Sequence, residues 1–86
     1  MSQNTTAVLN AEGKVNDLLA DLFELNPKTI CDDWTHEDIA LWDSLQHLRM
    51  ITAMEQEFGI KFSMAEIRSM ENIGQIRSIL RKKVGR

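Results

Sequence analysis

The sequence is short of cysteine, tyrosine and long apolar runs, and each shortage excludes a class of protein. Its one cysteine, Cys31, cannot form an internal disulfide, which excludes a disulfide scaffold and fits a reducing compartment. Tyrosine is absent and no segment sustains an apolar–polar alternation, so strands are not expected. No apolar run approaches the roughly 18 residues of a transmembrane helix, and the N-terminus lacks the basic and apolar regions of a signal peptide. We therefore expect a cytoplasmic protein without a membrane span.

What the 86 residues do contain is the composition of one small globular domain, with 43% hydrophobic and 27% charged residues. A domain of this length buries only about 60–65% of the surface of its unfolded chain, so a deep catalytic cavity is not expected. We interpret residues 1–86 as a single domain with its core over about residues 6–83. Residues 1–5 and 84–86 are expected to be frayed, and the protein is expected to be a monomer.

Charge is divided unevenly along the chain. Residues 1–58 carry eleven acidic and three basic residues, whereas residues 59–86 carry seven basic and two acidic ones. The basic residues gather at the end of a predicted helix, where the helix dipole favours cations. Without helix-turn-helix spacing or interleaved aromatic residues, this segment does not predict nucleic-acid binding.

Apolar periodicity predicts four helices, of which the first runs from about Thr6 to Leu25. Gly13 weakens its first half, and Pro27 ends it because proline cannot continue a helix. Its apolar stripe consists of Val8, Val15, Leu18, Leu19, Leu22 and Phe23.

The second predicted helix starts at Asp43 or Ser44, both good N-caps, and stops at Gly59, a natural C-cap. Its predicted apolar face consists of Leu48, Ile51, Met54 and Phe58.

A capping box, Ser63 with Glu66, opens a short third helix that ends near Met70. The fourth helix begins near Asn72 and carries Ile73, Ile76, Ile79, Leu80 and finally Val84. These elements predict an all-α fold: a small antiparallel four-helix bundle of three longer helices and a short third one.

A long connection, residues 26–43, precedes the second helix and has no sustained periodicity. A loop of this length in a compact domain is usually functional or held by its own side chains. We expect Ile30, Ile39, Leu41 and Trp42 to hold it, and a short helical turn near residues 37–40. Four methionines, Met50, Met54, Met64 and Met70, are expected to fill gaps in the core.

Self-contained enzyme chemistry is not expected. Ser44 and His47 are three apart on one helix face, but a serine hydrolase also needs a third group behind the histidine and an oxyanion hole. The two histidines, His36 and His47, lack partners at the spacing that zinc sites use, so no metal site is predicted.

The strongest local signal is the segment from Leu41 to Leu45. A serine in the first turn of a helix lies beside unpaired backbone N–H groups, and such a helix end favours phosphate. Asp43 places a negative charge at the same end. Taken alone, the Asp43-Ser44 pair could also be an ordinary helix cap in a non-covalent protein-interaction module.

The sequence resembles the acyl carrier protein family, the phosphopantetheine-binding carrier domains, over about residues 15–82. Asp43-Ser44-Leu45 resembles the family's attachment motif, and Phe58-Gly59-Ile60, fourteen to sixteen residues after Ser44, resembles the exit from its second helix. The segment 73–80 resembles the closing helix of the family.

The resemblance implies that Ser44 carries a 4′-phosphopantetheine arm, installed from coenzyme A by a phosphopantetheinyl transferase. Asp43 would then help this transferase to recognise the site, and Leu45 would complete the motif. The protein would carry an acyl or aminoacyl group as a thioester and present it to loading and downstream biosynthetic enzymes, with no catalytic activity of its own.

The second helix departs from the acidic docking face of the fatty-acid-synthesis carriers. The expected docking positions here are Gln46, His47, Arg49, Thr52 and Glu55. Only the last of these is acidic, and Trp42 stands where a small residue is common. These departures suggest a discrete carrier for a specialised pathway, such as polyketide, lipid-modifying, aminoacyl or surface-saccharide assembly.

Overall fold

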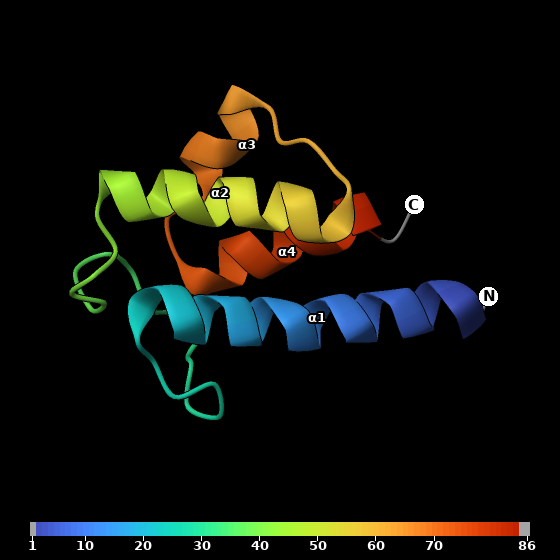
Figure 1. The fold of residues 1–86 in the computed structure, drawn as a ribbon, viewed down its shortest axis with the longest axis horizontal. Coiled ribbons are helices and arrows are strands. Elements are labelled where there is room, and N and C mark those ends of the chain that lie inside the picture. The colour runs from blue at the N-terminus through green and yellow to red at the C-terminus, as the bar shows by residue number, and fades with distance from the viewer. Residues whose placement is uncertain (1, 85–86) are drawn as a thin grey trace.

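The computed structural model describes the backbone of residues 2–84 and the side chains of residues 13–84. Within that part of the chain it has four helices and no strand: α1 (Ser2–Phe23), α2 (Ser44–Phe58), α3 (Met64–Ser69) and α4 (Ile73–Val84). Helices α2 and α4 pack against α1 and run antiparallel to it, while the short α3 lies across α2 (Figure 1). The predicted all-α bundle is confirmed.

Helix α1 begins earlier than predicted. Its first residue is Ser2 instead of Thr6, so residues 2–5, which were expected to fray, are helical. Nothing in this polar segment interrupts a helix, and Gly13 has no neighbour that a side chain would meet. Val84, also expected to fray, is instead the last residue of α4. Residue 1 and residues 85–86 lie outside the described residues, as does the side chain of Val8.

The same helix also ends two residues earlier than predicted. Glu24 adopts left-handed backbone with φ of 56°, and the Leu25 N–H donates to the Ala20 carbonyl at 3.0 Å. This bond from the second residue after the helix back to its last turn is that of a Schellman cap. The helix therefore stops at Phe23, before Pro27 has any effect.

Local caps fix the ends of α2 and α3 where the sequence predicts them. Asp43 caps the start of α2, and Gly59, with φ of 64°, caps its end in left-handed backbone that suits glycine. Both bonds of the predicted capping box are present at α3, since Ser63 and Glu66 each accept the other's backbone N–H.

One hydrophobic core is shared by α1, α2, α4, the long connection and the segments just before and after α3. Its buried residues are Val15, Leu19, Phe23, Ile39, Trp42, Met50, Ile51, Met54, Phe62, Met70, Ile73, Ile76 and Leu80. Leu18, Leu22, Ile30, Phe58 and Ile79, which were also predicted to face inward, are half-buried against it. Helix α3 contributes no fully buried residue, so it is the helix least held by packing.

Three predicted core residues are exposed instead. Leu48 is 56% exposed because it lies roughly 140° around α2 from the centre of the stripe formed by Met50 and Met54. Leu41 is 40% exposed and so does not hold the connection, whereas Met64 is 63% exposed as the first residue of α3. Leu48 was therefore wrongly predicted to lie on the inward face of the second helix, and Met64 was wrongly predicted to fill a gap in the core.

Backbone contacts with α4 hold the long connection. The N–H groups of Ile73 and Gly74 donate to the carbonyls of Trp34 and Asp32, at 3.0 and 2.8 Å. Thr35 and Asn72 form an isolated antiparallel bridge beside them. Two first-turn donors of α4, which have no acceptors within the helix, are thus satisfied by the loop.

Arg77 adds a side-chain clamp to this contact. Its Nη1 donates to Asp32 at 2.7 Å and its Nη2 to Asn16 of α1 at 2.6 Å, with only 18% of the arginine side chain exposed. The clamp therefore joins α4, the loop and α1.

The expected helical turn near residues 37–40 is a hydrogen-bonded turn and not a helix. The N–H groups of Asp38 and Ile39 both donate to the Thr35 carbonyl, at 2.9 and 3.1 Å. Ile39 and Trp42 enter the core from this end of the loop, as predicted, and direct the chain into α2.

Candidate functional site

Ser44 is the first residue of α2, and it is exposed. The preceding Asp43 is in extended backbone, and its Oδ1 accepts the Gln46 N–H at 2.8 Å. Among the described residues, no acceptor is bonded to the N–H of Ser44 or Leu45. The hydroxyl-bearing residue therefore stands at a helix start with a cap but with free first-turn donors, which is favourable for an anion.

Gln46, expected to dock partners, is turned toward the body of the protein. Its Nε2 donates to the carbonyl of Leu22, in the last turn of α1, at 2.8 Å, and the residue is half-buried. Its Oε1 accepts from Nη1 of exposed Arg49 at 3.2 Å. Gln46 thus ties the start of α2 to the end of α1, while Arg49 remains at the surface.

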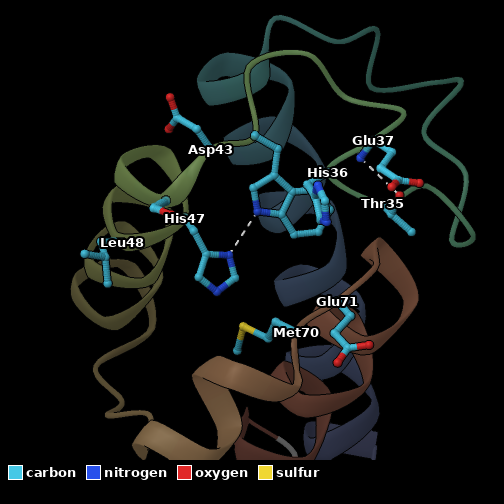
Figure 2. A pocket seen from close by; sticks show the side chains of 10 residues that line it. Thr35, His36, Glu37, Asp43, His47, Leu48, Met70 and Glu71 are labelled. Carbon is cyan, nitrogen blue, oxygen red and sulfur yellow. Dashed lines mark hydrogen bonds between the residues drawn. The ribbon is translucent and has the colours of Figure 1, made fainter.

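His47 is also half-buried, and both of its ring nitrogens have partners. The indole Nε1–H of Trp42 donates to His47 Nδ1 at 2.9 Å, which is the dashed line at His47 in Figure 2. His47 Nε2 lies 3.0 Å from the Ile67 carbonyl of α3. This arrangement was not predicted, although a buried tryptophan N–H needs an acceptor and a histidine five residues away can supply one. Neither ring nitrogen is directed to Ser44, so the pair is not a nucleophile and its base.

The two remaining docking candidates differ from each other. Glu55 is 19% exposed, and its Oε2 accepts the backbone N–H of Phe62 at 2.9 Å, while Lys61 lies 3.9 Å from its other oxygen. Thr52 is exposed and lies beside Arg49 along the outer side of α2.

A surface groove of about 970 Å³ opens beside Ser44. The loop, the start of α2 and the link from α3 to α4 form its walls (Figure 2). Its lining residues are Thr35, His36, Glu37, Trp42, Asp43, Ser44, His47, Leu48, Met70 and Glu71. The groove therefore combines an apolar interior with carboxylates, from Glu37, Asp43 and Glu71, among its lining groups.

Apolar side chains are exposed on both sides of Ser44. Leu45 is 58% exposed and Leu48 56%, and Leu41 just before the helix is 40% exposed. Large apolar side chains left in water next to a potential site are a common mark of a partner surface.

The described residues contain no group of three or more histidine, cysteine, aspartate or glutamate side chains arranged to hold a metal ion. Exposed Cys31 lies in the loop, and His36 is exposed in the groove wall. The structure thus offers a hydroxyl at a helix start and a groove next to it.

No protein-family model matches the chain. It is similar over nearly its whole length to the protein named polyketide-8 synthase acyl carrier protein 2 of Streptomyces avermitilis. Of 85 aligned residues 28% are identical, and the alignment covers 99% of this chain and 97% of that protein. This chain is therefore similar to an acyl carrier protein. By its name, that relative is a carrier protein of a polyketide synthase.

Within residues 2–84, every helix of this chain is too short or too polar to cross a lipid bilayer.

Proposed function

We propose that this protein carries an acyl group as a thioester on a 4′-phosphopantetheine arm attached to Ser44. The observation that supports this most is the position of Ser44: an exposed serine on the first turn of α2, directly after the acidic cap Asp43, in a chain similar to an acyl carrier protein over its full length. The name of that relative makes a polyketide intermediate the first cargo to test.

The residues around Ser44 fit a phosphodiester. Free first-turn N–H groups and the positive end of the helix dipole favour a phosphate at this position. The Asp43 carboxylate accepts the Gln46 N–H, and this hydrogen bond stabilises its negative charge. Asp43 can therefore stay charged beside the phosphate and contribute to recognition by the transferase. When bound, the arm supplies a terminal thiol for the acyl group, and the groove beside Ser44 offers room along which it could lie.

The protein's own residues position the arm and take no part in chemistry on the cargo. Asp43 holds the first turn, Leu45 completes the motif at the surface, and Gln46 fixes α2 to α1. Loading therefore depends on a separate phosphopantetheinyl transferase, and turnover of the cargo depends on partner enzymes.

Intact-mass analysis tests the attachment site. The apo protein is incubated with coenzyme A and a broad-specificity phosphopantetheinyl transferase. We expect the mass to rise by one phosphopantetheine group, and we expect no rise in Ser44→Ala. The matched control is Ser78→Ala, which removes another exposed helical serine and should load like the wild type. An unchanged wild-type mass, or loading of Ser44→Ala, would show that Asp43-Ser44 is only a helix cap.

We further propose that partner enzymes dock on the outer side of α2, at Leu45, Leu48, Arg49 and Thr52. All four are exposed, whereas Gln46, His47 and Glu55 make internal contacts and would support this surface from behind. Arg49 makes the surface suited to a partner that presents an acidic group among apolar ones.

Charge reversal tests this surface. Arg49→Glu should weaken binding to the cognate enzyme and improve loading by transferases adapted to acidic carriers. The control is Arg68→Glu, which reverses the charge of an exposed arginine on α3. It should change neither binding to the cognate enzyme nor loading by the transferases. If the two variants bind and load equally, the charge of Arg49 on α2 does not contribute to partner docking.

We also propose that residues 1–86 act as a single carrier domain, monomeric and in the cytoplasm. The one core shared by the helices and the single exposed thiol of Cys31 support this. Light scattering in reducing buffer should give the mass of one chain, and a dimer mass would contradict the proposal.

A further inference from the structure

His47 connects the loop, α2 and α3 at the groove beside Ser44. It accepts the Trp42 indole N–H on Nδ1 at 2.9 Å, and its Nε2 lies 3.0 Å from the Ile67 carbonyl. The two rings are also nearly parallel, with an angle of 16° and centroids 6.0 Å apart. Both Trp42 and His47 line the groove.

These partners fix the state of the imidazole. An indole N–H can only donate, so Nδ1 must be an unprotonated acceptor. A carbonyl can only accept, so Nε2 must carry the hydrogen. The arrangement therefore requires the neutral ring with its proton on Nε2, and a second proton on Nδ1 would bring two donors face to face.

The two partners depend on His47 to different degrees. Trp42 is 6% exposed and also contacts Phe23, with ring centroids 5.6 Å apart, so its ring is held from two sides. Helix α3 has six residues and none of them is buried. The contact at the Ile67 carbonyl is thus a principal link between α3 and the helix that carries Ser44.

We infer that His47 is a positioning residue, which acts in its neutral Nε2–H form to hold the Trp42 ring and α3 in place as parts of the groove beside Ser44. The inference deepens the proposed function and rests on it, since the groove is where the arm and its cargo would lie. It assigns His47 to the interior framework of the carrier.

Charged groups lie near His47 on each neighbouring element. His36 and Glu37 of the loop, Asp43 before α2 and Glu71 after α3 line the same groove, and Glu66 and Arg68 flank Ile67 in α3. None of them is hydrogen-bonded to the His47 ring within the described residues. Its two neutral partners therefore set the form of the ring.

Nitrogen-15 NMR of the apo protein tests the inference without requiring that Ser44 be loaded. At neutral pH we expect the His47 ring to show the Nε2–H form, with the Trp42 indole N–H signal shifted by its hydrogen bond. As the pH is lowered and the ring takes a second proton, that indole signal and the amide signals of α3 should move together. A Nδ1–H ring, or an indole signal that does not follow the protonation of His47, would overturn the inference.

Three variants separate positioning from simple stability. His47→Gln offers one acceptor and one donor on a planar group, so it should keep most of the wild-type indole and α3 signals and lose their pH response. His47→Phe keeps a ring but loses both bonds, so it should shift these signals and lower kcat/KM for loading, on the order of tenfold. The control His36→Gln replaces the exposed histidine of the groove wall and should leave the signals in place. Equal signals and loading in His47→Gln and His47→Phe would contradict a positioning role.

The outcomes for the two proposals are distinct. If Ser44 is never loaded while the NMR results hold, the attachment proposal fails and the His47 framework stands. If Ser44 is loaded but the His47 ring carries its proton on Nδ1, the attachment proposal stands and the inference about His47 fails. If His47→Phe fails to fold, the ring form, its pH response and the His47→Gln variant still decide the inference.

Discussion

The starts of α2 and α4 differ in what occupies their backbone donors. At α4, the N–H groups of Ile73 and Gly74 donate to carbonyls of the loop, and that of Gln75 to Asn72. At α2, the Asp43 side chain takes the Gln46 N–H, and the two preceding N–H groups have no acceptor among the described residues. The chain therefore uses one helix start to hold its own loop and leaves the other open for an external anion.

The close contact at Gly74 should be the most sensitive feature of the occupied start. A Cβ at Gly74 would lie 3.2 Å from Asp32 Cβ and 3.3 Å from the Asp32 carbonyl oxygen. Gly74→Val should therefore lower the free energy of unfolding by about 2 kcal/mol, measured by urea denaturation. The control Gly13→Ala has open space around it and should raise that free energy by about 0.5–1 kcal/mol. Wild-type stability in Gly74→Val would show that the loop is not held this closely.

Loss of the Arg77 clamp should be the next largest effect. Arg77→Met removes the charged hydrogen bonds to Asp32 and Asn16 at a mostly buried position, and should lower the free energy of unfolding by about 1.5 kcal/mol. The comparison variant is Lys14→Met, which breaks the exposed ion pair with Glu57 and should change it by about 0.5 kcal/mol or less. If the free energy of unfolding falls equally in the two variants, the buried position of Arg77 does not make its contacts stronger than the exposed ion pair of Lys14.

At the open start of α2, two substitutions separate the cap from the charge. Asp43→Ala removes the acceptor for the Gln46 N–H and should lower the free energy of unfolding by about 1 kcal/mol. Asp43→Asn keeps an acceptor and should stay close to wild-type stability, while its loading by the transferase slows because the negative charge is gone. Normal loading of Asp43→Asn would show that Asp43 acts only as a helix cap and not in recognition by the transferase.

The start of α3 should give the smallest effect, and it depends on pH. The Ser63 N–H bond, and then Lys83 at 3.0 Å, lower the pKa of Glu66 below its ordinary value near 4.5. The charged carboxylate therefore stabilises the fold at pH values above 4.5, its ordinary pKa. This stabilisation is lost as the pH falls through the lowered pKa of the folded state. The urea midpoint of the wild type should exceed that of Glu66→Gln at neutral pH, and the difference should shrink as the pH is lowered below 4.5. A difference that does not change with pH would contradict this account.

Local chemistry explains what the sequence could predict. The caps Asp43, Gly59 and Ser63 act within a few residues of their own helices, so their side chains and backbone preferences fixed three helix ends in advance. The unexpected end of α1 at Glu24 is also local, but a glutamate gives no preference for left-handed backbone, and nothing in the sequence marked it.

Long-range contacts explain the rest. Leu48 fits an apolar stripe by spacing alone, and only the packing of α1 and α4 decides that the stripe is centred on Met50 and Met54. The bridge from Thr35 to Asn72 joins segments far apart in the sequence and has no local signature. In the candidate site, Ser44 and Asp43 were predicted at the open helix start, but the inward turn of Gln46 and His47 depends on partners in α1 and α3.

The contact of the loop with α4 has a consequence for synthesis on the ribosome. The loop that leads to Ser44 obtains its backbone partners from Ile73 and Gly74 and its clamp from Arg77, all in the helix that is translated after the other three. While the chain is still growing, these backbone partners and this clamp are missing, even after the serine has left the exit tunnel. A transferase that reads the folded surface would therefore meet its substrate only after α4 has emerged, which delays modification until translation has passed the core.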